Sequence, residues 1–285
     1  MTSDARSFGR QRQPLRIFFY GRFVNPLLPA QGAPMLNYCC RMMCSFLILL
    51  SVGTLHADDA VSTDSAPVSE RYLKRADHDP NGIGKFYMDR EIAHVMGFAG
   101  AEWLERSSRE EEERLNLLIR SLHLKPGDVV ADIGAGSGVI SVRMAELLLP
   151  NGTVMAVDVQ KEMLERLRAN CDAMGVRNVE PVKGTQKTTG LKDASIDLAI
   201  MVDVYHEFEY PYEMLADISR AMKPGGRVVF VEYRKEDPTV PIKEVHKMSQ
   251  VQVRREAEQP EFGLHWSETI HVLPRQHIIV FQKQK

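Results

Sequence analysis

The second half of the chain alternates between short apolar runs and stretches whose apolar residues recur at helical spacing. Residues 129–133 form a run rich in β-branched residues, which is typical of a buried parallel strand. Ile140, Met144 and Leu147 then follow at helical spacing. The alternation continues, with further strands expected at 153–157, 179–182, 195–202 and 227–233 and helices at 161–174 and 211–222. This pattern predicts an α/β fold with a doubly wound, mostly parallel sheet.

The end of the chain departs from that alternation. Two apolar stretches, 264–273 and 277–281, are joined by a tight turn at Pro274, so these two strands should be antiparallel. Ser249 and Gln252 have the spacing of a capping box that opens one more helix before them. We therefore expect a seven-stranded sheet that finishes in a C-terminal antiparallel hairpin.

The segment 79–124 precedes the first expected strand of this sheet. A turn-rich entry leads to a helix expected over 86–106, which is a candidate cap for a binding pocket or a plain packing helix. Ser108 and Glu111 then form a capping box. It should open a helix with one apolar face, formed by Leu115, Leu118, Ile119 and Leu122. We interpret 79–124 as an N-terminal helical cap and 125–285 as the main domain.

Residues 1–57 have the pattern of an extension followed by a secretory signal peptide. Arg41 precedes the apolar run 42–52, and small and polar residues follow as far as Ala57. The run is too short for a comfortable membrane span. The chain is therefore expected to be exported or periplasmic, with an uncut anchor through 42–52 and a cytoplasmic chain as the alternatives. Residues 58–78 are expected to be a linker, acidic and rich in Ser and Thr near its start.

Composition narrows the classes of partner. The net charge of −2 gives no electrostatic reason to expect nucleic acid, and 44% hydrophobic residues are ample for a core. Cys171 is the one cysteine outside the N-terminal region, and no Cys/His cluster has the spacing of a zinc site, so no metal is expected. The sequence gives no oligomeric state.

A glycine-rich turn after the first strand carries the candidate chemistry. It reads Asp132-x-Gly134-x-Gly136-x-Gly138, with Ser137 placed to cap the next helix. A strand, a glycine turn and a helix N-terminus together form a nucleotide-binding corner. The pyrophosphate fingerprint would need glycine at Val139, and a carboxylate before the first glycine would repel a pyrophosphate but suit an ammonium group. An ordinary tight β–α turn is the alternative.

At these residues the chain resembles the class I methyltransferases that use S-adenosylmethionine (SAM), and it is similar to the group that methylates small molecules such as quinones and arsenite. The resemblance implies that Asp132, Gly134, Gly136 and Gly138 hold the methionine part of SAM. It also implies that Val159 packs on the adenine. Asp158, about twenty residues past the loop, is placed to accept the ribose hydroxyls. Thr185 or Gln186 stands where such enzymes often carry an acid to the adenine.

The segment from Asp203 to Phe208 resembles the family's fourth motif, which faces the methyl group and the acceptor. The resemblance makes Asp203 and His206 the candidate catalytic residues, with His206 as a general base or as a residue that only packs. His246 and Lys247 lie in a later loop that is either solvated or in contact with an anionic substrate. Arsenite as the acceptor would need several cysteines, which Cys171 alone does not provide.

The expected function is therefore SAM-dependent methyl transfer to a small-molecule acceptor by in-line displacement. Two alternatives belong to other classes. One is a SAM-binding protein without catalysis, and the other is a nicotinamide-dependent oxidoreductase, disfavoured by Val139 and by the C-terminal hairpin.

Overall fold

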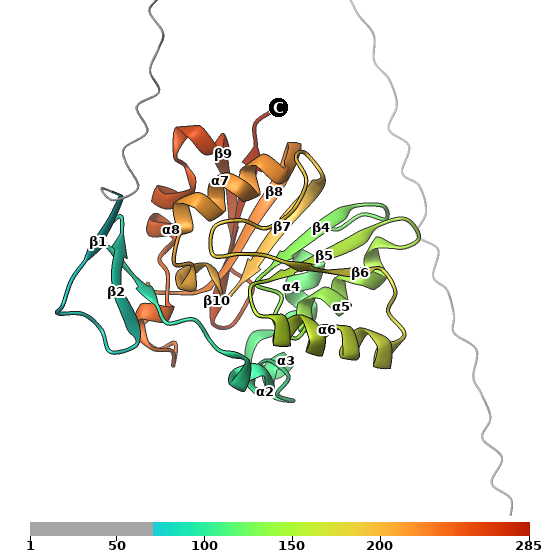
Figure 1. Cartoon of the computed structure of the whole chain (residues 1–285), viewed down its shortest axis with the longest axis horizontal. Helices are drawn as coiled ribbons and strands as arrows, with labels where there is room; N and C mark the ends of the chain where they lie inside the picture. The colour runs from blue at the N-terminus through green and yellow to red at the C-terminus, as the bar shows by residue number, and fades with distance from the viewer. Residues whose placement is uncertain (1–70) are drawn as a thin grey trace, which may run out of the picture. The chain divides into compact units, whose positions relative to one another are not determined.

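The computed structural model describes residues 71–285 and centres on a seven-stranded sheet with the order β6-β5-β4-β7-β8-β10-β9 (Figure 1). Its strands are β4 (Val129–Ile133), β5 (Thr153–Asp158), β6 (Val179–Lys183), β7 (Ile196–Val202), β8 (Met222–Tyr233), β9 (Leu264–Ile270) and β10 (Gln276–Lys283). Strands β4 to β8 pair in parallel, whereas β10 pairs antiparallel with both β8 and β9. This arrangement confirms the expected doubly wound α/β sheet with its C-terminal hairpin.

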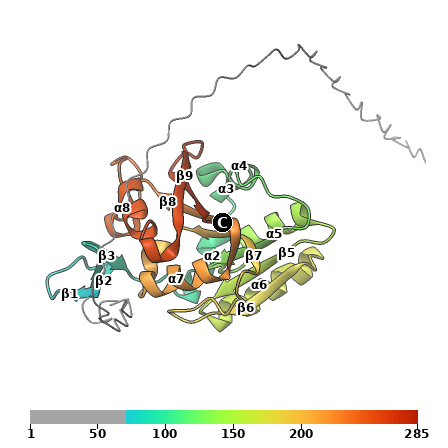
Figure 2. The same cartoon turned by 90° about the horizontal axis from the view of Figure 1, so that it is seen from above.

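The helices cover both faces of this sheet (Figure 2). They are α2 (Ala101–Leu104), α3 (Arg109–Glu113), α4 (Leu115–Ser121), α5 (Val139–Ala145), α6 (Lys161–Met174), α7 (Pro211–Ala221) and α8 (Gln250–Ala257). Short 3₁₀ turns include η1 (Phe98–Gly100), η2 (Glu146–Leu148), η3 (Tyr205–Glu207), η4 (Glu244–His246) and η5 (Pro260–Phe262). Helices α7 and α8 pack on one face, and α4 and α5 pack on the other.

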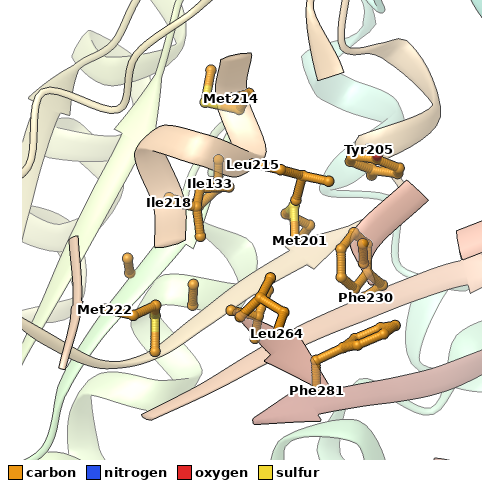
Figure 3. Packing of buried hydrophobic residues seen from close by; sticks show 14 of the residues in the cluster. Ile133, Met201, Tyr205, Met214, Leu215, Ile218, Met222, Phe230, Leu264 and Phe281 are labelled. Atoms are coloured by element: carbon orange, nitrogen blue, oxygen red, sulfur yellow. The ribbon is translucent and has the colours of Figure 1, made fainter. Parts of the chain in front are cut away.

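The central strands are buried on both sides because their alternate residues enter two separate cores. Met201, Phe230 and Phe281 come from neighbouring strands and meet Leu215 of α7 in one core (Figure 3). Residues one position along the same strands enter the second core, against α4 and α5. The rigid sheet therefore fixes where the carboxyl ends of β4, β5 and β7 lie.

The helix expected over 86–106 is not present. Its first part instead belongs to a small antiparallel sheet of β1 (Tyr72–Lys74), β2 (Gly82–Tyr87) and β3 (Arg90–Ala93), and helical structure within 86–106 is limited to η1 and α2. Met88 and Asp89 both have positive φ and form a two-residue hairpin turn, in which Tyr87 faces Arg90. The turn lacks the glycine that usually marks such hairpins, so the sequence pattern does not reveal it. Strand β1 also lies within the segment expected to be a linker.

Two of the helix N-caps that we expected from the sequence are not formed. The helix expected after Ser108 is broken at Arg114, whose φ of 54° separates α3 from α4, and Ser108 makes no side-chain cap. The N-cap of helix α5 is Gly138, so Ser137 does not cap it. Ser249 does cap α8, because its side chain accepts a hydrogen bond from the backbone N–H of Gln252.

The expected N-terminal extension and signal peptide, residues 1–57, lie outside the described residues. Within 71–285, no helix combines the length and the apolar character that a membrane crossing requires.

Candidate functional site

A pocket opens at the carboxyl ends of β4, β5 and β7, where ligands bind in open parallel sheets. We call it the first pocket. Seven of the residues singled out from the sequence line it, namely Gly134, Gly136, Asp158, Val159, Thr185, Gln186 and Asp203. Further lining residues are Val95, Met96, Leu104, Ile133, Val157, Gln160, Met163, Val202, Val204, Glu207, Phe208 and Met214. The structure thus brings most of the expected cofactor residues to one cavity.

Two glycines let the loop after β4 form the floor of this pocket. Gly134 and Gly136 have φ of 75° and 55°, a region that favours glycine. A Cβ at Gly134 would lie 2.5 Å from the Val204 side chain, and one at Gly136 would lie 2.6 Å from the Leu104 side chain. Larger residues would therefore clash with the pocket wall on the opposite side.

Asp158 is the last residue of β5 and holds this loop in place. Its carboxylate accepts hydrogen bonds from the backbone N–H of Gly136 at 2.9 Å and of Gln160 at 2.8 Å. Burial raises the pKa of Asp158, while the two backbone hydrogen bonds act against that shift. A preformed acceptor group therefore stands in the pocket wall.

The segment that follows β3 covers the first pocket. Gln160 binds it through both ends of its amide, because its Oε1 accepts from the Phe98 backbone at 2.8 Å and its Nε2 donates to the Met96 carbonyl at 2.9 Å. Met96 and Leu104 complete the wall. Sequence reasoning placed the cover in roughly this region, but as a helix.

The remaining two residues of the glycine motif lie apart from the first-pocket wall. Asp132 is buried within β4 and accepts a hydrogen bond from the Ser141 hydroxyl at 2.6 Å. Gly138 is the N-cap of α5, and a Cβ there would lie 2.7 Å from the Leu167 side chain of α6. Gly138 therefore allows two helices to pack closely, whereas Asp132 carries a charge that is poorly solvated. Burial raises the pKa of Asp132 to about 6.

We expect Asp132→Asn to stabilise the fold at pH 7. The folded-state pKa lies above the usual 3.8, so the charge opposes folding increasingly as the pH rises from about 4 to 6. The gain should reach about 1–3 kcal/mol at pH 7 and vanish near pH 4, since one pKa unit corresponds to about 1.4 kcal/mol. Denaturant unfolding of both proteins at several pH values measures it. An equal difference at every pH would contradict the assignment to this carboxyl group.

A second pocket adjoins the first. It is lined by His94, Met96, Trp103, Leu104, Arg109, Glu113, Val202, Asp203, His206, Glu207, Tyr233, Pro241, Ile242, Lys243 and His246. Five residues line both cavities, namely Met96, Leu104, Val202, Asp203 and Glu207. The two pockets therefore share a wall at the carboxyl end of β7.

Asp203 stands in that shared wall in a strained conformation. Its φ is 52°, which is uncommon for a residue other than glycine and typical of functional sites. Its Oδ2 accepts from the Gln276 side chain at 3.1 Å, whereas its Oδ1 is buried with no partner among the described residues. Burial, and then the nearby carboxylates of Glu113 and Glu232, raise its pKa well above the usual value. Asp203 thus offers an unpaired acceptor atom to a ligand.

His206 is fixed by its neighbours in η3. Its Nδ1 lies 2.6 Å from Glu232 on β8, and Arg90 of β3 donates to its backbone carbonyl at 3.1 Å. Its Nε2 lies 3.1 Å from Nδ1 of His246 in η4. Burial lowers the pKa of His206 to about 4 and raises that of Glu232 to about 8, because buried charges lose their hydration.

Glu207, Glu232 and His246 were not placed at the site by sequence reasoning. His246 was weighed as a solvated loop residue or a contact to an anion, yet it packs edge-on against His206. It lies 40 residues from His206 along the chain, so a local sequence motif could not have linked the two residues. Glu232 could have been singled out from the sequence, because it is a single carboxylate at the end of an apolar strand. Burying such a charge costs free energy unless the carboxylate has a bonding partner.

Comparisons with known proteins agree with this geometry. A family model described as a methyltransferase domain matches residues 124–271. The chain is 24% identical over 42% of its length to the ubiquinone/menaquinone biosynthesis C-methyltransferase UbiE of Wigglesworthia glossinidia brevipalpis, of which it covers 48%. It is 30% identical over 37% of its length to the arsenite methyltransferase of Halobacterium salinarum, of which it covers 27%. The chain thus spans about half or less of the length of these curated relatives.

A solved structure supports the fold independently. The crystal structure of a SAM-dependent methyltransferase from Aquifex aeolicus matches with a TM-score of 0.62 and 23% identity, covering 66% of this chain and 99% of that one. The family model spans about half of the chain, and the sheet has the order and the terminal hairpin expected of that fold. The chain therefore belongs to the methyltransferase-domain family, and its family and fold imply SAM as the cofactor.

Proposed function

We propose that this protein transfers a methyl group from SAM, held in the first pocket, to a small molecule held in the second pocket. The observation that carries the proposal is the shared wall, where five residues line both cavities. Methyl transfer requires donor and acceptor to meet in line, and two adjoining pockets on a rigid sheet provide that alignment.

The residues of the first pocket fit SAM. The glycine loop brings the backbone of Gly134 and Gly136 to the pocket surface, Asp158 presents a carboxylate suited to ribose hydroxyls, and Asp203 presents an unpaired oxygen. When bound, SAM supplies a methyl group already activated by the sulfonium charge. The protein's own task is then to orient both partners and to exclude water, which the cover formed by Met96 and Leu104 favours.

The second pocket favours a small acceptor with an apolar body. Trp103, Tyr233, Pro241 and Ile242 supply apolar and aromatic surface, while Lys243 adds a cation. A quinone-like ring, as in the name of the UbiE relative, fits such a lining. Arsenite fits less well, because Cys171 is buried on α6 and lines neither pocket.

Asp158→Ala is expected to weaken SAM binding by about 1.5–3 kcal/mol, the scale of hydrogen bonds to a charged group. Isothermal titration calorimetry with SAM measures the loss, and NAD serves as the ligand that should not bind. Asp172→Ala, which removes an exposed acid from α6, is the control and should bind SAM like the parent chain. Unchanged SAM affinity in a folded Asp158→Ala protein would contradict the assignment.

We also propose that the chain is exported and that its mature form begins near Asp58. The apolar run 42–52 and the small residues up to Ala57 support this proposal. N-terminal sequencing of the protein from the envelope of its own cells should return a sequence starting near Asp58. Recovery of a cytoplasmic chain that still begins at Met1 or Met35 would refute it.

A further inference from the structure

Three side chains in the second pocket bring their donor atoms close together. They are His206 and Glu207 of η3 and His246 of η4. The His206 Nε2 lies 3.1 Å from the His246 Nδ1, and the Glu207 Oε1 lies 3.9 Å and 3.8 Å from these two nitrogens. A point equidistant from the three atoms is about 2.1 Å from each, which is the length of a zinc–nitrogen or zinc–oxygen bond.

A hydrogen bond between the two imidazoles accounts for only part of this arrangement. It explains the 3.1 Å distance, but the Glu207 Oε1 lies beyond hydrogen-bond distance of both rings. The other oxygen of Glu207 accepts from the Met96 backbone at 3.2 Å, which orients the carboxylate. A carboxylate that is only 10% exposed thus lies close to two nitrogens to which it is not hydrogen bonded.

The surroundings of His206 are those of a metal ligand. Metal-binding histidines usually donate their second ring nitrogen to a carboxylate, which fixes the ring and its tautomer. The contact of Nδ1 with Glu232 at 2.6 Å has this form, and Glu232 is itself held by the Tyr205 backbone N–H at 3.0 Å. Within 71–285, the ion-pair contacts recorded for Glu207 and Glu232 are with these histidines.

We propose that His206, Glu207 and His246 bind one divalent transition-metal ion of the zinc class. Two imidazoles and one carboxylate suit zinc and its neighbours better than magnesium or calcium, which prefer oxygen ligands. Three protein donors leave at least one coordination position open, as in catalytic zinc sites. The three ligands line the second pocket, and Glu207 also lines the first, so an ion held by them would lie in the second pocket close to the shared wall.

The site also indicates a class of acceptor, a consequence that rests on the proposed function. A hydroxyl group bound to the ion would lose its proton to solvent more readily, because the ion stabilises the oxyanion. Oxygen acceptors on a small apolar ring or chain would then be preferred over carbon acceptors.

The test uses the full chain, stripped of metal with a chelator and titrated with Zn²⁺ by calorimetry. Co²⁺ serves as a spectroscopic probe, because imidazole and carboxylate ligands produce visible absorption bands. We expect one ion per chain and no comparable binding of Mg²⁺. Elemental analysis of the loaded protein gives an independent stoichiometry.

Variants distinguish this site from adventitious binding. His246→Ala and Glu207→Gln should weaken Zn²⁺ binding by more than about 100-fold, and Glu232→Gln by about 10–100-fold, the range for outer-shell partners. His94→Ala is the matched control, because His94 lines the same pocket but lies outside the group of three, and it should bind Zn²⁺ like the parent chain. Thermal unfolding of each variant shows that it is folded.

Absence of stoichiometric Zn²⁺ binding by the parent chain would overturn the proposal, as would parent-like binding by both His246→Ala and Glu207→Gln. Titration of the metal-free chain with SAM separates this result from the proposed function. SAM binding without Zn²⁺ binding refutes the metal site alone. Zn²⁺ binding without SAM binding refutes the proposed function and leaves the metal site standing.

Discussion

Replacing Arg90 with methionine should lower the free energy of unfolding by about 3–5 kcal/mol, the cost of leaving one partner of a buried ion pair uncompensated. Arg90 of β3 holds Glu256 of α8 through two parallel hydrogen bonds of 2.7 and 2.9 Å. The two side chains are only 7% and 0% exposed, so water would not solvate the remaining Glu256 carboxylate. In a domain of this size the melting temperature should fall by about 6–20 °C.

The control is Arg255→Met, which removes a pair between the same two regions at the surface. Arg255 lies 3.1 Å from Asp89, with both side chains well exposed, and its loss should cost no more than about 1 kcal/mol. Denaturant unfolding of both variants gives the comparison. Adding Glu256→Met to Arg90→Met should recover much of the stability, since no charge is then left buried. Equal losses for the two single variants would show that burial does not set the energy of the Arg90 pair.

The ion pair between Arg90 and Glu256 also connects the small N-terminal sheet to the candidate site. Arg90 also donates to the His206 carbonyl, and the Tyr205 hydroxyl donates to Glu256 at 2.7 Å. The turn η3, which carries His206, is therefore held from both β3 and α8. Arg90 lies in the segment that we interpreted from the sequence as a helical cap. It thus helps to position the candidate catalytic histidine from outside the main sheet.

Local patterns were sufficient to predict the parts of the site that come from one strand and its next turn. The run 129–133, the glycines after it and Asp158 at the end of β5 are all read from neighbouring residues, and the parallel sheet brings them together by its regular geometry. The burial of Asp132 could not be read in this way. An acid beside a glycine motif suggests a ligand contact, yet an inward-facing position on a strand directed this side chain to Ser141.

Contacts between segments that lie far apart in the sequence could not be predicted from local sequence patterns. His246 meets His206 because the loop after β8 folds back over the end of the sheet, and no spacing in the sequence encodes that return. The hairpin of β2 and β3 was missed because its turn, Met88-Asp89, contains no glycine and begins with Met88, a residue type that rarely adopts positive φ. In both cases tertiary packing selects the conformation, so the residues themselves give little local signal.

His206→Ala is expected to lower the rate of methyl transfer by about 10²–10⁴, the range for loss of a positioned group that takes up the acceptor's proton. The same direction is expected if His206 instead holds the proposed metal ion, because the ion would stabilise the deprotonated acceptor. SAM affinity should hardly change, because His206 lines the second pocket and does not line the first. The expected signature is therefore a lower kcat with an unchanged Kd for SAM. Single-turnover rates with radiolabelled SAM, normalised to the folded fraction, measure the first quantity, and calorimetry measures the second.

The readout must separate a role in the reaction from a role in packing, because His206 is 2% exposed and its loss leaves Glu232 without its ring partner. Glu232→Gln retains the volume and the backbone contact of Glu232 but removes the carboxylate that orients the ring. If His206 acts on the acceptor, Glu232→Gln should lower kcat by less than His206→Ala and should also leave SAM affinity intact. His271→Ala, at an exposed histidine just after β9, controls for handling and should keep the parent rate. A folded His206→Ala protein with the parent rate would show that alignment of donor and acceptor alone carries the reaction, and His206 would then be a packing residue of η3.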